Sequence, residues 1–128
     1  MEDIFVGRLM STPVETVSPQ ATLNEAATRL LEHNIGSVVV VDDDGHLEGI
    51  LTATDFVQLA ADDGLASEAT VAEYMSTDVI TRTANDPITE VADTMIDNRF
   101  HHVPVVDDDE GVIGIITTTD LTAYVSGR

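Results

Sequence analysis

An internal repeat divides this chain into two similar halves. Residues 71–121 align with residues 6–56 at a constant offset of 65 without a gap, and 19 of the 51 aligned positions are identical. Chance would give only a few identities, so the chain is two copies of one supersecondary unit. We assign residues 1–65 to the first copy and residues 66–128 to the second, with a joining stretch rich in Ala, Asp, Glu and Ser at 61–70.

Hydrophobic periodicity predicts the same elements in both copies. Apolar residues recur at helical spacing over 23–31 and 88–96, with a capping-box sequence at 22–25 and an Asp-Pro start at 86–87. Two apolar, β-branched runs flank an acidic turn at 42–45 and again at 107–111, which predicts an antiparallel hairpin in each copy. Extended pieces at 14–17 and 79–82 precede the helices, and second helices start near Thr54 and Thr119. The order strand, helix, strand, strand, helix places the chain in the α+β class.

The charge balance excludes some functions. The chain has 24 acidic residues against 5 arginines and no lysine, for a net charge of −19, and nowhere do the arginines form a patch. Binding to nucleic-acid phosphates needs clustered cations, so we exclude a nucleic-acid partner. With 43% hydrophobic residues the chain is too apolar to be disordered. We interpret the acidic surface as that of a halophilic, cytoplasmic protein, the alternative being an ordinary acidic protein from a mesophile.

Missing residue types and motifs exclude further classes of function. The absence of cysteine removes disulfides, thiolate catalysis and zinc-thiolate sites. No signal peptide or apolar run of membrane-spanning length is present, so we expect no membrane partner. We find no nucleophile elbow, metalloprotease motif or phosphate-cradling lysine loop, and we expect that the chain is not an enzyme.

The motif Gly-x-x-Thr-x-x-Asp occurs once in each copy, at 49–55 and 114–120. A glycine near a strand end lets the backbone approach a ligand closely, and a threonine hydroxyl can donate to a phosphate or ribose oxygen. An aspartate three residues later, at a helix start, can accept from two vicinal hydroxyls, as in ribose. The alternative is that Thr54 and Thr119, or the aspartates, only cap the second helix. The candidate ligand residues from this motif are Thr52, Thr54, Asp55, Thr117, Thr119 and Asp120.

Nearly the whole chain resembles a tandem pair of CBS domains, named after cystathionine beta-synthase. The resemblance rests on these two motifs, on the Met-Ser-Thr openings at 10–12 and 75–77, and on the Val-Val-Asp runs. The resemblance implies two motifs packed with pseudo-twofold symmetry, and pairs that dimerise into flat discs. It also implies that adenosine-containing ligands, such as AMP, ADP, ATP or S-adenosylmethionine, bind in clefts between the motifs and signal by conformational change.

The same resemblance implies a phosphate-binding segment where each hairpin starts. Its candidate residues are Arg99, His101, His102, Val103 and Pro104 in the second copy, and Gly36, Ser37 and Val38 in the first. Because the first copy has no cation there, we expect the second copy to bind phosphates better. The alternative for the two histidines is a surface pair, and a shared metal is disfavoured because neighbours on a strand point to opposite faces.

For adenine, the resemblance implies backbone contacts from the segment after the first strand of each copy. The candidate residues are Thr16, Val17 and Ser18 in the first copy, and Thr81, Arg82 and Thr83 in the second. Arg82 is also one of the few cations available for a phosphate, the alternative being a surface arginine that balances nearby acid. The acidic runs 42–44 and 107–110 lack the ligand spacing of a calcium loop, so we interpret them as solvated turns and predict no metal site.

Two functional interpretations remain open at this point. In the first, the chain is a regulatory module that senses an adenosine-containing small molecule, with no cofactor, and passes the signal to an unknown regulated protein. In the second, its nucleotide sites are vestigial and the chain is a structural scaffold for dimerisation. Both interpretations predict a homodimer.

Overall fold

The computed structural model describes residues 4–62 and 68–127 and forms two compact units. Unit 2 is Glu15–Val79, and unit 1 combines Met1–Val14 with Ile80–Arg128. Both units contain helices and a small sheet, which confirms the α+β class. The sequence boundary between residues 65 and 66 lies outside the described residues. The structural units divide the chain after residues 14 and 79, whereas the sequence repeat divides it once, near residue 65.

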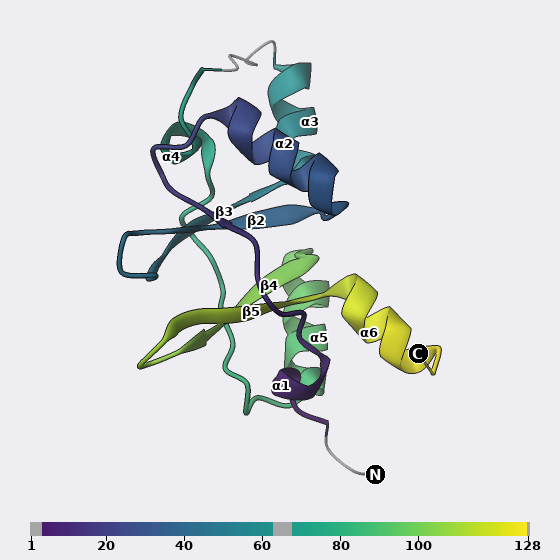
Figure 1. Cartoon of the computed structure of the whole chain (residues 1–128). Helices are drawn as coiled ribbons and strands as arrows, with labels where there is room; N and C mark the ends of the chain where they lie inside the picture. The colour runs from purple at the N-terminus through teal and green to yellow at the C-terminus, as the bar shows by residue number, and fades with distance from the viewer. Residues whose placement is uncertain (1–3, 63–67, 128) are drawn as a thin grey trace. The chain divides into compact units, whose positions relative to one another are not determined.

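Unit 2 is built on a three-stranded sheet. Strand β1 (Thr16–Val17) pairs in parallel with β2 (Ser37–Val41), and β2 pairs antiparallel with β3 (Leu47–Thr52). Helix α2 (Leu23–His33) connects β1 to β2, and α3 (Ala53–Ala61) follows β3 directly. A short helix, α4 (Val71–Tyr74), completes the unit. Helices α2 and α3 lie beside each other against the hairpin, as Figure 1 shows.

Unit 1 repeats this plan with a two-stranded sheet. Strands β4 (His102–Asp107) and β5 (Gly111–Thr117) pair antiparallel, and Arg82 forms an isolated parallel bridge with Val105 where unit 2 has β1. Helix α5 (Ile88–Asn98) precedes the hairpin, and α6 (Thr118–Val125) follows it. The short helix α1 (Val6–Leu9) belongs to this unit and contacts α6. The helices and hairpins predicted from periodicity are thus confirmed.

The two copies exchange their opening segments. Helix α1 comes from the first copy, but its Val6 is fully buried in the core of unit 1, with Val91 and Ile116. Helix α4 opens the second copy, and its Val71 is fully buried in the core of unit 2, with Leu23 and Leu51. A four-residue helix is too short to show a periodic pattern, so hydrophobic periodicity did not predict α1 or α4.

The helix starts differ in detail from the sequence prediction. Thr22 caps α2 as predicted, since its side chain accepts a hydrogen bond from the backbone N–H of Glu25. For α5, the N-cap is Pro87 rather than Asp86. The Asp86 carboxylate instead accepts from the backbone N–H of Thr83, within the preceding turn. Across the described ranges, no helix is long and apolar enough to cross a membrane.

Candidate functional site

The threonine and aspartate of each repeated motif form a capping box at the start of the following helix. In unit 2, Asp55 Oδ2 accepts from the backbone N–H of Thr52 at 2.8 Å, and Thr52 Oγ1 accepts from the N–H of Asp55 at 3.2 Å. In unit 1, Thr117 and Asp120 make the same two contacts at 2.9 and 3.2 Å. The capping alternative is therefore observed, although the N-caps are Thr52 and Thr117 rather than the residues two positions later.

The two capping boxes are not identical. The Thr117 hydroxyl also donates to Asp120 Oδ2 at 3.2 Å, and the hydroxyl of Ser11 donates to Asp120 Oδ1 at 2.9 Å. Among the described residues, Asp55 accepts a side-chain or backbone hydrogen bond only from Thr52. The aspartate of unit 1 is therefore engaged on both oxygens, while that of unit 2 is engaged on one.

The start of each hairpin lies beside its own capping box. Ser37 is the cross-strand partner of Thr52, and the carbonyl of Gly36 accepts from the N–H of Ala53 at 2.9 Å. In unit 1, His102 is the partner of Thr117, and the carbonyl of His101 accepts from the N–H of Thr118 at 3.0 Å. The structure thus brings together the candidate phosphate segment and the candidate ribose aspartate of each unit.

The surroundings of His102 reduce its positive charge, while its place in a phosphate-binding segment stays a prediction. Burial lowers the pKa of His102 below its usual 6.5, and the neighbouring His101 lowers it further, while Asp120 opposes both effects. The imidazole is therefore neutral near pH 7, and it can donate one hydrogen bond rather than act as a cation. His101 is exposed, and Arg99 is exposed at the left-handed C-cap of α5, with φ of 58°.

Several other candidate residues have buried side chains. Val17 is 6% exposed, and the side chains of Val38, Val103 and Pro104 are fully buried in the cores of their units. Core packing occupies these four side chains, so a ligand could reach only the backbone of these residues, and their place in a binding segment stays a prediction. Thr54 and Thr119 are exposed in the first turns of α3 and α6.

The candidate adenine segments lie away from the capping box of their own unit. Thr16 pairs with Val39, in the middle of β2, while Thr52 pairs with Ser37 at its end. The Ser18 hydroxyl bonds to the side chain of Gln20. In unit 1, the equivalent segment follows the same course, since the N–H of Arg82 donates to the carbonyl of Pro104 at 3.1 Å.

The Arg82 side chain is held inside unit 1. Its Nη2 donates to Thr94 Oγ1 on α5 at 2.6 Å, and its Nη1 donates to the carbonyl of Thr81 at 3.2 Å. The Nε atom is buried and has no hydrogen-bond partner among the residues that the structure describes. Neither sequence interpretation of Arg82 anticipated this arrangement, in which the guanidinium links the first extended segment to the first helix through a neutral hydroxyl.

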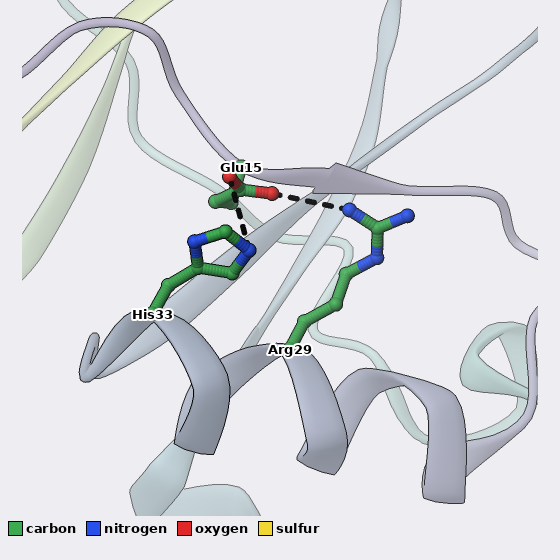
Figure 2. A network of polar contacts seen from close by, with 3 residues as sticks. All are labelled: Glu15, Arg29 and His33. Carbon is green, nitrogen blue, oxygen red and sulfur yellow. Dashed lines mark hydrogen bonds and ion pairs between the residues drawn. The ribbon is translucent and has the colours of Figure 1, made fainter.

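Unit 2 makes the equivalent link with an ion pair, which Figure 2 shows. Arg29 Nη1 on α2 lies 3.1 Å from Glu15 Oε2, and His33 Nε2 lies 3.5 Å from Glu15 Oε1. Sequence reasoning missed this network because its members are 4 and 14 residues apart and only the fold brings Glu15 beside α2.

The motif glycines make room for another segment of the chain, a role that the sequence analysis did not include. A Cβ at Gly49 would lie 2.7 Å from the carbonyl oxygen of Ser76 and 2.8 Å from Met75 Sδ. A Cβ at Gly114 would lie 2.8 Å from Met10 Sδ and 3.1 Å from the carbonyl oxygen of Ser11. The backbone that approaches these glycines is therefore the Met-Ser segment of the other copy, and the repeat retains glycine because that segment needs the space.

The acidic runs form hairpin turns, as predicted. Asp42 Oδ1 accepts from the backbone N–H groups of Asp44 and His46, both at 2.9 Å, and these bonds lower the pKa of Asp42. Gly45 adopts φ of +84°, which favours glycine in the turn. The side chains of Asp42, Asp44 and His46 bring ligand atoms within 4.8 Å of one another, a grouping that the sequence prediction did not include. The hydrogen bonds of the turn account for their placement.

Comparisons with known proteins agree with the fold. The chain is 35% identical over 116 residues to an uncharacterized 17.7 kDa protein of Acidianus ambivalens, a match that covers 91% of this chain and 70% of that protein. It is 34% identical to the L-aspartate semialdehyde sulfurtransferase of Methanocaldococcus jannaschii over 97% of this chain but only 24% of that enzyme. This chain thus matches a small part of that enzyme.

Among solved structures, a similar one is the CBS domain pair of protein MJ0100 in complex with 5'-methylthioadenosine and S-adenosyl-L-methionine. It has a TM-score of 0.90 and 33% sequence identity, and the match covers 98% of both chains. The family model described as CBS domain matches twice, over residues 6–62 and 71–127. With both of its repeated copies matched, this chain belongs to the CBS domain family as a tandem pair.

Proposed function

We propose that this chain is a regulatory module that binds an adenosine-containing small molecule and reports its presence by a change of conformation. The ligand is a signal in this proposal rather than a cofactor, and the chain is not an enzyme. The MJ0100 domain pair, at 33% identity over 98% of both chains, was solved with 5'-methylthioadenosine and S-adenosyl-L-methionine, which supports this ligand class.

The observation that carries the proposal is the Asp55 carboxylate. The N–H of Thr52 fixes its orientation through Oδ2, and no described residue donates to Oδ1. The carboxylate stands at the first turn of the nine-residue helix α3, beside Ser37 across the hairpin. A fixed carboxylate with an open oxygen is suited to accept hydrogen bonds from the two vicinal hydroxyls of a ribose.

Calorimetric titration with AMP, ATP, S-adenosylmethionine and 5'-methylthioadenosine in molar potassium chloride tests the proposal. We expect saturable binding of at least one ligand, and loss of that binding in the double variant Asp55→Asn/Asp120→Asn. Asparagine keeps an oxygen for the N-cap N–H but removes the charge, so helix capping should persist while diol binding weakens. Absence of binding by all four ligands would contradict the proposal.

A dimerisation scaffold with vestigial sites is the second candidate. The observation that favours it is that both motif aspartates complete capping boxes, which gives them a structural reason to persist without a ligand. In that case the variant Asp55→Asn/Asp120→Asn changes the stability slightly, and neither the wild type nor the variant binds a nucleotide.

We further infer a homodimer in both cases. Leu31 and Ile96 occupy equivalent positions of the repeat, on α2 and α5, and are 82% and 74% exposed. Large apolar side chains at the same place in both copies suit a twofold interface, in which each patch is used twice. Light scattering at high salt should give about twice the chain mass, and the change Leu31→Glu/Ile96→Glu should shift it towards the monomer.

We also propose that the chain works in a salt-rich cytoplasm. A net charge of −19 on 128 residues repels itself strongly unless counter-ions screen it. The Debye length falls from about 10 Å at 0.1 M salt to about 3 Å at 1 M. The melting temperature should therefore rise between these salt concentrations, and a flat curve would remove the halophilic interpretation.

A further inference from the structure

The two motif aspartates differ in how many hydrogen bonds they can still accept. An ionised carboxylate offers about four lone-pair positions. In unit 1, Asp120 Oδ2 accepts from the N–H and the hydroxyl of Thr117, at 2.9 and 3.2 Å, and Oδ1 accepts from Ser11 at 2.9 Å. About one position therefore remains open on Asp120.

Asp55 retains more of its capacity. Its Oδ2 accepts from the N–H of Thr52 at 2.8 Å, and within residues 4–62 and 68–127 no other donor reaches the carboxylate. About three positions are open, and both positions on Oδ1 are among them. A vicinal diol presents two O–H donors, so Asp55 can accept both without losing an existing bond, whereas Asp120 cannot.

Two hydroxyls make the difference, that of Thr117 on Oδ2 and that of Ser11 on Oδ1, and only Ser11 comes from another segment of the chain. Ser11 and Ser76 occupy equivalent positions of the repeat, and each bridges the second strand of its hairpin. The N–H of Ser11 donates to the carbonyl of Ile115 at 2.7 Å, and the N–H of Ser76 donates to the carbonyl of Ile50 at 2.9 Å. Only the Ser11 hydroxyl reaches the aspartate of its unit.

We infer that Ser11 is a selectivity-determining residue, which occupies Asp120 and makes the two motifs unequal towards a vicinal diol. The Asp55 motif accepts a ribose with both hydroxyls free and discriminates against a deoxyribose. The Asp120 motif has to release Ser11 before it can accept a second hydroxyl, so it binds a ribose more weakly and discriminates less. The inference rests on the proposed function, since it assigns the ligand preference of the same motifs.

The probes are adenosine and 2'-deoxyadenosine, which differ only in the diol. Calorimetry of the full chain in molar potassium chloride should show that Asp55→Asn weakens adenosine binding more than tenfold, and that Asp120→Asn weakens it only a few-fold. One hydrogen bond to a charged group corresponds to about a tenfold change in affinity or more. Equal losses in the two variants would contradict the inequality of the motifs.

The role of Ser11 is isolated where only the Asp120 motif is intact. In the Asp55→Asn background, Ser11→Ala should raise adenosine affinity about tenfold, because a lone pair is freed, and should change 2'-deoxyadenosine affinity less than threefold. The matched control is Ser76→Ala in the Asp120→Asn background, which should alter neither affinity. A merely structural role of Ser11 would change the two ligands equally and would not move their ratio.

The outcomes separate the inference from the proposed function. If Ser11→Ala leaves adenosine affinity unchanged or lowers it while the wild type binds, Ser11 does not compete with the ligand and the inference is wrong. If the wild type binds neither nucleoside nor any of the four ligands above, both the proposed function and the inference fail. Ser11 is exposed, so the alanine variant should fold, and the adenosine to 2'-deoxyadenosine ratio of the single variant Ser11→Ala gives an independent check.

Discussion

The two units tie their first extended segment to their first helix with different chemistry. In unit 2, Arg29 on α2 reaches Glu15 in the segment, at 3.1 Å (Figure 2). In unit 1, the direction is reversed, because Arg82 in the segment reaches Thr94 on α5, at 2.6 Å. Position 94 is the repeat equivalent of position 29, but Arg82 is the equivalent of Val17, two residues beyond Glu15, so the two contacts share the helix position and not the position in the segment.

This comparison shows which parts of the repeat tolerate divergence. The Thr and Asp of both capping boxes are identical between the copies, while the tie between segment and helix keeps its position on the helix but neither its residues nor its position in the segment. The tie of unit 2 is a charged pair, with side chains 48% and 27% exposed. The tie of unit 1 joins a charge to a neutral hydroxyl that is buried. The two units should therefore respond differently to salt and pH.

The largest difference that we predict concerns the motif glycines. Gly49→Ala should cost about 3 kcal/mol of the free energy of unfolding, because its new Cβ meets a backbone carbonyl oxygen at 2.7 Å that cannot move alone. Gly114→Ala should cost about 1 kcal/mol, because its shortest contact is with the flexible end of Met10. Denaturant unfolding in molar salt measures both. Equal costs would mean that the opening segments are seated alike in the two units.

These glycines also mark the limit of what the sequence could predict. Apolar periodicity over 23–31 and 88–96 identified both long helices, and the acidic turns identified both hairpins, because these signals are local. The exchange of α1 and α4 between the copies could not be predicted. An alignment compares the copies in chain order, and it does not show that the opening segment of one copy packs into the core formed by the other copy. The sequence analysis therefore considered only a ligand beside these glycines and did not include the room that they make for Met10 and Met75.

The candidate site was predicted only in part, because some of its features are local in the sequence and others depend on contacts between distant segments. The identical Thr and Asp of the motif were found at once, and the structure places them with Ser37 and His102, which were also candidates. Residue identity alone did not show that Val38 and Val103 point into the cores, because the face of a strand follows from its pairing. The contact of Ser11 with Asp120 spans 109 positions of the chain, and no local pattern indicates it.

The tie of unit 1 should be insensitive to salt. Arg82→Met removes the hydrogen bonds from the guanidinium to the Thr94 hydroxyl and to the Thr81 carbonyl, but it also removes the buried Nε, which has no partner among the described residues. The lost hydrogen bonds destabilise the fold, and removal of the unpaired Nε offsets part of that cost. We therefore expect the free energy of unfolding to fall by about 1 kcal/mol. Because Thr94 is neutral, the loss should be equal in 0.2 M and 2 M potassium chloride. Thr94→Val is the matched control, and a loss that shrinks with salt would indicate an acidic partner for Arg82.

The pH response should distinguish the hairpin starts of the two units. Burial lowers the pKa of His102 in the folded state, so between that value and 6.5 the unfolded chain binds a proton that the folded chain does not. Stability contributed by the neutral imidazole is present above pH 6.5 and is lost as the pH falls through this window. Ser37, at the equivalent position, does not titrate.

Unfolding curves between pH 8 and 5 measure this effect. The variant His102→Asn should flatten the decline in stability below pH 6.5, while Ser37→Ala should leave its slope as in the wild type. The lowered pKa of Asp42 acts in a separate window, below its ordinary 3.8, where protonation removes the favourable turn bonds. A wild-type slope retained in His102→Asn would mean that another group is responsible.

The smallest effect that we predict is that of the Glu15–Arg29 pair, and it is the one that salt should abolish. Both side chains are partly exposed, and exposed ion pairs contribute about 0.2–1 kcal/mol, so a double-mutant cycle with Glu15→Gln and Arg29→Met should give a coupling near 0.5 kcal/mol at 0.1 M salt. At 2 M salt the Debye length is shorter than the 3.1 Å between the charged atoms, and the coupling should fall close to zero. A coupling that persists at 2 M would show that this tie, like the one made by Arg82, does not depend on salt. The two units would then differ in the residues of the tie but not in its response to salt.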